Sequence, residues 1–108
     1  MKFKFNKYQA TGNDFVIIDN RLKIFPKKNQ ELIARICDRK FGVGGDGLIL
    51  IEASDQANFQ MIYFNADGAL GSFCGNGSRA ATRFAQSLGL IKSSGSLLAY
   101  DGTHSVEI

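Results

Sequence analysis

Residues 75–89 read GNGSRAATRFAQSLG, and this segment predicts the central element of the fold. Apolar residues, most of them small, recur in it at helical spacing: Ala80, Ala81, Phe84, Ala85 and Leu88. Gly89 follows as a residue that can end a helix in the left-handed conformation. Because small side chains permit close packing, we expect this helix to lie inside a curved sheet.

Short apolar runs on both sides of that helix predict strands. Residues 2–5 alternate polar with apolar side chains, as a half-buried strand does, and residues 15–18 form a compact apolar run. Further strands are expected at residues 48–51, 59–64, 97–100 and 105–108. A hairpin could join the strands at 48–51 and 59–64, and a turn at 65–68 would end the second of them.

A second helix is expected after the turn at residues 26–29, with Asn29 as its cap. Leu32, Ile33, Ile36 and Cys37 share one side of it at helical spacing. We therefore expect Cys37 to be a core residue.

Composition predicts the class of protein and its compartment: a small domain of a cytoplasmic protein. The chain has 108 residues and a net charge of +3, and its only adjacent lysines are Lys27 and Lys28, so no basic stripe favours nucleic acid. No segment approaches the roughly 18 apolar residues of a membrane span, and the N-terminus lacks a signal peptide's apolar region. A single histidine, His104, and no Cys-x-x-Cys spacing argue against a metal site and a disulfide framework.

Cys74 stands directly before Gly-Asn-Gly and the predicted helix. The first N–H groups of a helix lack internal partners and carry the positive end of the dipole, so they stabilise a thiolate. The pKa of such a thiol should lie below the value of a free cysteine, about 8.5, so that the thiol can serve as a base. A buried, inert cysteine is the alternative. Packing alone does not require the Gly-Asn-Gly that follows, so we favour the reactive thiol.

The loop Gly42–Gly47 fits the spacing Gly-x-Gly-x-x-Gly, with Asp67 twenty residues beyond Gly47. A dinucleotide site needs a strand before these glycines and a helix after them. Here the predicted order is reversed, so we interpret the segment as a glycine loop that packs near a ligand or simply turns the chain.

Four segments taken together resemble the diaminopimelate epimerase family: Thr11–Phe15, Phe41–Leu48, Phe64–Gly68 and Cys74–Arg79. They follow the order and spacing of that family's first half, over nearly the whole chain. The resemblance implies an α+β fold, with a curved, mostly antiparallel β-sheet (a half-barrel) wrapped around a central α-helix. Residues 1–108 would form the N-terminal domain of an enzyme with two similar domains, and the C-terminal domain is absent from this chain.

The resemblance also implies an isomerase that interconverts LL- and meso-diaminopimelate without a cofactor, on the path to lysine. One thiolate removes the α-proton and a thiol on the opposite face returns one. Cys74 would be the first-half cysteine, Gly75 and Asn76 would bind the substrate through helix-terminal amides, and Asn13 and Asn65 would be polar substrate contacts. From the residues alone, Asn13 and Asn65 are also ordinary turn residues.

Some positions depart from the family pattern. Leu70 replaces a commonly acidic residue, Ala80 replaces a frequent second cysteine, and Gly47 stands where some members carry a substrate-contacting Gln. The second-half cysteine has no counterpart, and Cys37 cannot replace it from the core. Asp14, Asp46 and Asp67 are expected to bond the backbone in turns.

Other functions remain open. The proline racemases and phenazine-pathway isomerases share the architecture, although Gly-Asn-Gly after the cysteine is closer to the diaminopimelate branch. A non-catalytic half-domain, binding module or truncated product would preserve the fold without turnover. A thiol redox protein is disfavoured by the absence of Cys-x-x-Cys. The expected partners are a small amino-acid substrate and the C-terminal domain of the same enzyme, with a homodimer as a further option.

Overall fold

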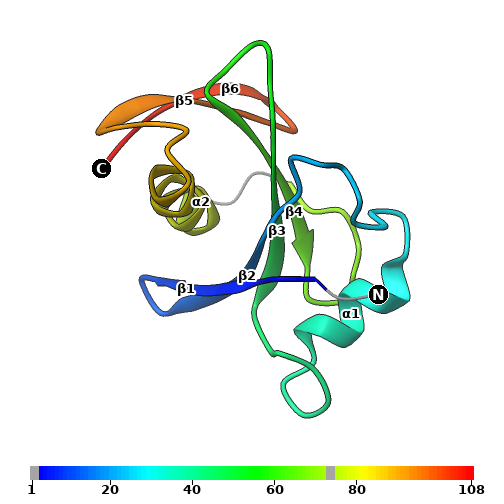
Figure 1. Ribbon diagram of the computed structural model, residues 1–108. Coiled ribbons are helices and arrows are strands. Elements are labelled where there is room, and N and C mark those ends of the chain that lie inside the picture. Colours follow the sequence, from blue (N-terminus) through cyan, green and yellow to red (C-terminus); the bar gives the residue numbers. More distant parts are fainter. Residues whose placement is uncertain (1–2, 73–74) are drawn as a thin grey trace.

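The computed structural model describes residues 3–72 and 75–108. Its six strands form one sheet in sequence order: β1 (Asn6–Ala10), β2 (Asn13–Asp19), β3 (Gly47–Glu52), β4 (Phe59–Asn65), β5 (Ser94–Ala99) and β6 (Gly102–Glu107). The helix α1 (Gln30–Cys37) connects β2 to β3, and α2 (Gly75–Ser87) lies between β4 and β5 in the chain. Figure 1 shows the sheet curling around α2, which is seen end-on.

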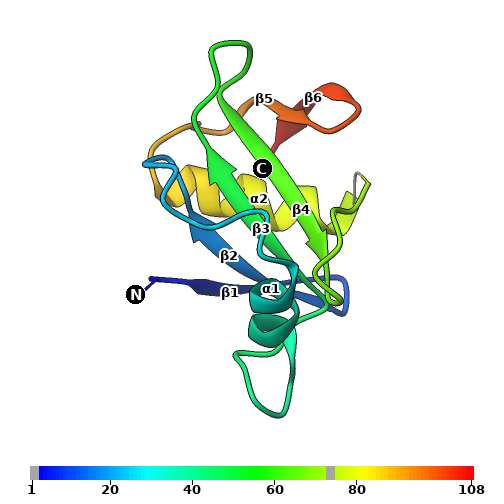
Figure 2. The same ribbon diagram turned by 90° about the vertical axis from the view of Figure 1, so that its right-hand side faces the viewer.

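Strand direction follows from what joins the strands. The pairs β1–β2, β3–β4 and β5–β6 are antiparallel, whereas β2–β3 and β4–β5, which are separated by the two helices, are parallel. Parallel neighbours need such a crossover connection. The two helices cover opposite faces of the sheet (Figure 2). The expected α+β fold, a curved and mostly antiparallel sheet around a central helix, is confirmed.

Alternation along the strands divides the core in two. On the concave face, Phe15, Ile17, Ile49, Ile51, Phe59 and Met61 pack with Ala80, Ala81, Phe84 and Ala85 of α2. On the convex face, Val16, Ile18, Leu48, Leu50 and Phe64 pack with Ile33 and Cys37 of α1. Since β2 and β3 are buried on both faces, their continuous apolar runs are explained.

The helix ends agree with the sequence analysis. The side-chain oxygen of Asn29 accepts a hydrogen bond from the backbone N–H of Leu32 at 3.1 Å, so Asn29 caps α1. After α2, Gly89 has a φ of 80°, the left-handed conformation that glycine adopts without strain.

The strand expected at residues 2–5 is wrong. Residues 3–5 have no regular secondary structure, and the first strand runs from Asn6 to Ala10 instead. Its position is set by the tight turn at Thr11 and Gly12, which pairs Ala10 with Asn13 and Tyr8 with Phe15. Phe3 packs its ring on Phe25 at 5.0 Å between centroids, outside the sheet. The other expected strands are present with shifted ends, and the β3–β4 hairpin is confirmed.

Candidate functional site

The candidate site lies at one edge of the concave face, where β2 and β3 begin and β4 ends. Phe15 pairs with Gly47, and Gly47 pairs with Asn65, so these three residues form one row across the sheet. Asn13 lies two residues before Phe15 on the same face, because side chains alternate along a strand. The structure thus brings Asn13 and Asn65 to the same edge.

The N-terminus of α2 meets this edge through Asn76. Its Nδ2 donates to Oδ1 of Asn13 at 2.6 Å, across 63 positions of sequence. Gly75, the first residue of α2, is exposed, and a Cβ placed on it would meet no atom of the other described residues within 4 Å. Three of the predicted site residues, Asn13, Gly75 and Asn76, are therefore adjacent. Cys74, the predicted catalytic residue, lies outside the described residues.

Asn65 satisfies the turn interpretation through its backbone. Its N–H donates to the carbonyl of Ala69, and its own carbonyl accepts from the N–H of Gly68, both at 2.9 Å. The side chain is exposed and makes no hydrogen bond to another described residue. Its amide therefore remains able to contact a ligand at the edge of the concave face.

The three aspartates behave differently from one another. Oδ1 of Asp67 accepts from the N–H of Ala69 at 2.9 Å, so Asp67 bonds the backbone of its own turn, as expected. Oδ2 of Asp46 accepts from the N–H of Asp14 at 3.0 Å, which is a bond across 32 positions of sequence and not within a turn. Asp14 differs from both. It lies in β2 and pairs its carboxylate with Arg39 at 2.7 Å and with Lys7 at 3.2 Å.

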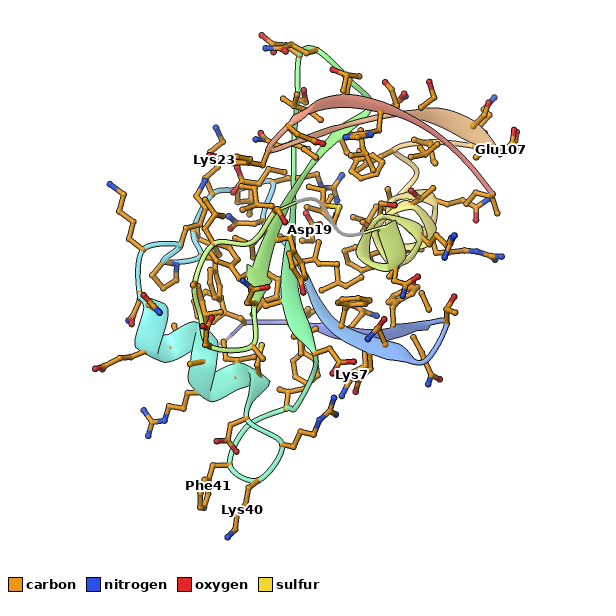
Figure 3. The ribbon with its side chains drawn as sticks, turned by 180° about the vertical axis from the view of Figure 1, so that it is seen from behind. Lys7, Asp19, Lys23, Lys40, Phe41 and Glu107 are labelled. Carbon is orange, nitrogen blue, oxygen red and sulfur yellow. The ribbon has the colours of Figure 1, made fainter. Side chains whose placement is uncertain are left out.

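These two cations, which contact the residue next to Asn13, were not indicated by the sequence patterns. The hydrogen bond from Arg39 holds the pKa of Asp14 well below its usual range, with Lys7 adding to the effect. Lys7, labelled in Figure 3, also donates to the carbonyl of Gly44. No local pattern indicates the contact with Arg39, because Arg39 reaches Asp14 across 25 positions of sequence.

A third residue that the sequence patterns did not indicate is Tyr63. A Cβ on Gly47 would lie 2.6 Å from Cε1 of Tyr63 and 2.8 Å from the carbonyl oxygen of Phe64. A Cβ on Gly71 would lie 2.6 Å from Cδ2 of the same ring. The ring of Tyr63 thus occupies the space that a side chain at position 47 would need. No Gln-like contact can come from position 47 in this arrangement.

The remaining departures are accommodated locally. Leu70 is exposed and forms an isolated antiparallel bridge with Phe64, while Ala80 is buried against the sheet. An open groove of about 450 Å³ runs beside α2, lined in part by Tyr8, Thr11, Arg79, Arg83 and Ser105.

Cys37 is a core residue, as predicted. Its side chain is 3% exposed, and burial raises its thiol pKa from 9.0 to about 11. At neutral pH this thiol is overwhelmingly protonated and out of reach of a substrate.

Two further features of the described residues concern metal ions and membranes. Within residues 3–72 and 75–108, no three His, Cys, Asp or Glu residues are grouped so that they could hold a metal ion. None of the described helices has the length and apolar character needed to cross a bilayer. The Gly42–Gly47 loop follows α1 and precedes β3, which is the reverse of the dinucleotide-binding order.

Similarity to known proteins agrees with this arrangement. The diaminopimelate epimerase family model matches residues 5–106. A diaminopimelate epimerase from Flavobacterium psychrophilum is 51% identical over 105 residues, which are 97% of this chain and 41% of the relative. One from a Synechococcus strain is 44% identical over 90 residues, 82% of this chain and 32% of the relative. The chain therefore spans less than half the length of these curated relatives.

A solved structure extends the similarity to the fold. The crystal structure of a Bacillus anthracis phenazine biosynthesis protein of the PhzF family superposes with a TM-score of 0.71. The alignment covers 100% of this chain and 36% of that one. Because the identity is only 21%, the similarity shows a shared fold only. Since the family match and the 51% identity both extend over almost the whole chain, this chain belongs to the diaminopimelate epimerase family.

Proposed function

We propose that this chain is the N-terminal domain of a cofactor-independent epimerase that interconverts LL- and meso-diaminopimelate, and that Cys74 is its catalytic thiol. The observation that carries the proposal is the 2.6 Å hydrogen bond between Asn76 and Asn13. The helix α2 begins directly after Cys74 in the sequence, and this hydrogen bond joins its first turn to the sheet. It meets the sheet at the end where β4 finishes with Asn65.

The chemistry follows from the helix terminus. The start of α2 is the positive end of the helix dipole, which favours negative charge and suits both a thiolate and the carboxylate of an amino-acid substrate. In this proposal the Cys74 thiolate takes the α-hydrogen as a proton and its electron pair stays on carbon. Asn13, Asn65, Gly75 and Asn76 hold the substrate while the negative charge develops.

Inversion requires a proton donor on the opposite face of the carbon. Cys37 is buried with a raised pKa, so it cannot act there. The donor must come from outside this chain, and we assign it to the C-terminal domain of the same enzyme. The 41% coverage of the Flavobacterium relative is consistent with such a domain. The cytoplasm and lysine biosynthesis are the setting that this function implies.

The test compares two forms of the protein. The first is the 108-residue chain. The second, called the joined protein below, is this chain continued by the remaining part of the Flavobacterium psychrophilum relative. Exchange of the α-hydrogen of LL-diaminopimelate is followed by NMR in D₂O. We expect exchange and epimerisation with the joined protein and neither with the chain alone. Substrate binding without exchange by the joined protein would instead identify a binding module and contradict the proposal.

A further inference from the structure

A line of hydrogen bonds runs from Asp46 to Arg79 through two asparagines of the site, Asn13 and Asn76. Nδ2 of Asn13 donates to Oδ2 of Asp46 at 3.2 Å. Nδ2 of Asn76 donates to Oδ1 of Asn13 at 2.6 Å, and Nη1 of Arg79 donates to Oδ1 of Asn76 at 2.9 Å. We call these four residues the amide relay. It connects the loop before β3, the start of β2 and the first turns of α2.

The charged ends of the amide relay fix the orientation of both amides. A carboxylate only accepts hydrogen bonds, so Asn13 must turn its NH₂ group to Asp46 and its carbonyl to Asn76. A guanidinium only donates, so Asn76 must turn its carbonyl to Arg79 and its NH₂ group to Asn13. Flipping the pair would place a carbonyl against the carboxylate and an NH₂ group against the guanidinium. Two neutral amides without these ends would have no such preference.

Asp46 is itself held in place. Its Oδ1 accepts from Nη2 of Arg39 at 3.1 Å, its Oδ2 accepts from the N–H of Asp14, and its own N–H donates to the carbonyl of Asp14 at 2.8 Å. Arg39 also makes two hydrogen bonds to the Asp14 carboxylate. The end of the relay that faces Asn13 is therefore anchored to both the loop and the sheet.

We propose that Asp46 is a positioning residue that orients Asn13, and through it Asn76, for substrate binding. This inference rests on the proposed function, since it concerns the same site. Each NH₂ group has two N–H donors and uses only one of them in the amide relay. The second N–H of each amide is thereby held in a fixed direction, ready to donate to a carboxylate or other acceptor on a substrate. Asp46 acts through the amides and does not touch the substrate.

The first arm of the test needs no activity. In the ¹⁵N-labelled chain, every asparagine side chain gives its own pair of amide resonances. Asp46→Asn keeps the shape but lets position 46 donate, so we expect the resonances of both Asn13 and Asn76 to move. Arg79→Met removes the other end and should move Asn13, two links away. The controls are Asp38→Asn, an exposed loop carboxylate that accepts only backbone N–H groups, and Arg83→Met, an exposed arginine one turn along α2. Controls that moved the same resonances, or relay variants that moved only the nearest amide, would overturn the relay.

The second arm measures catalysis in the joined protein. We expect Asp46→Asn to raise KM for LL-diaminopimelate by about tenfold, the worth of one well-ordered hydrogen bond, and to leave kcat within about threefold. Asp38→Asn should leave both within about twofold. If the unmutated joined protein exchanges α-hydrogen but Asp46→Asn behaves like Asp38→Asn, the positioning role is wrong and the proposed function stands. If the unmutated joined protein is inactive, the proposed function fails, and the substrate role of the relay fails with it.

Discussion

Asn20 donates a 2.6 Å hydrogen bond from Nδ2 to Oε2 of Glu52, and both side chains are buried, at 0% and 2% exposure. Oδ1 of Asn20 accepts from the N–H of Phe25 at 2.9 Å, and the Glu52 carboxylate also forms a salt bridge with Nζ of Lys27 at 3.0 Å. A buried charge is tolerated only when it is paired and hydrogen-bonded. This cluster therefore ties the segment between β2 and α1 to the end of β3.

Asn20→Ala should lower the free energy of unfolding by about 2–3 kcal/mol, because it leaves the buried carboxylate and the N–H of Phe25 each short of a partner. Urea unfolding followed by circular dichroism measures the change. Asp55→Asn, in the exposed β3–β4 loop, is the control and should change stability by less than about 0.5 kcal/mol. Equal, small effects of the two substitutions would show that the cluster does not stabilise the fold.

Periodicity was sufficient to predict the helices and the buried strands, because their side chains alternate or recur with the geometry of the element itself. Residues 15–18 and 48–51 form continuous apolar strands because both faces are covered, and residues 75–87 form a helix whose buried residues Ala80, Ala81, Phe84 and Ala85 recur at helical spacing. The first strand could not be found this way. NKYQA carries little apolar pattern, and its place depends on pairing with β2 across the turn at Thr11 and Gly12.

In the site, as in the fold, residues within local motifs could be predicted and residues defined by long-range contacts could not. The family motifs predicted Asn13, Gly75 and Asn76, and the structure brings them together. The roles of Arg39 and Tyr63 could not be predicted, since each depends on a contact between segments distant in sequence that local spacing does not encode. The turn interpretation of Asp14 is wrong for a similar reason, because its turn-like sequence context does not indicate that its carboxylate pairs with Lys7 and Arg39.

Stability should depend on pH through Asp14. Its pKa is lowered below the ordinary 3.8, first by Arg39 and then by Lys7, so its contribution is complete above that value and is lost as pH falls toward the depressed pKa. Asp14→Asn should therefore cost about 1 kcal/mol at pH 7, a small figure because Arg39 is 58% exposed, and the cost should shrink below about pH 4. Urea unfolding of both proteins from pH 3 to 7 measures it. A difference that grows on acidification would contradict the assignment.

Gly47→Ala should destabilise the chain by about 1–3 kcal/mol, because the added methyl group would lie 2.6 Å from the Tyr63 ring and 2.8 Å from a backbone oxygen. Gly75→Ala is the matched control, since its Cβ meets no atom of the other residues that the structure describes within 4 Å, and it should be close to neutral. Thermal unfolding compares the two. If Gly47→Ala melted at the wild-type temperature, the close approach of Tyr63 would be wrong.

The chain alone should self-associate. β1 and β6 are the two edges of the described sheet, and the edge of a sheet presents N–H and C=O groups that can pair with another chain. Phe41, at the tip of the loop between α1 and β3 (Figure 3), is 80% exposed, and Tyr100 is 78% exposed. Light scattering should give a mass above 11.8 kDa that rises with concentration. A constant 11.8 kDa across concentrations would identify a stable monomer and contradict this expectation.

The most direct test of the central claim is α-hydrogen exchange of LL- and meso-diaminopimelate in D₂O by the joined protein carrying Cys74→Ser or Cys37→Ser. A serine hydroxyl is far too weakly acidic to act as the base, so Cys74→Ser should abolish epimerisation in both directions and exchange of the isomer whose α-hydrogen faces position 74, while the circular dichroism spectrum stays unchanged. Cys37→Ser changes the core thiol and should lower stability but leave exchange in the folded protein. Near-native epimerisation, or near-native exchange of both isomers, by a folded Cys74→Ser protein would contradict the assignment of Cys74 as the catalytic thiol.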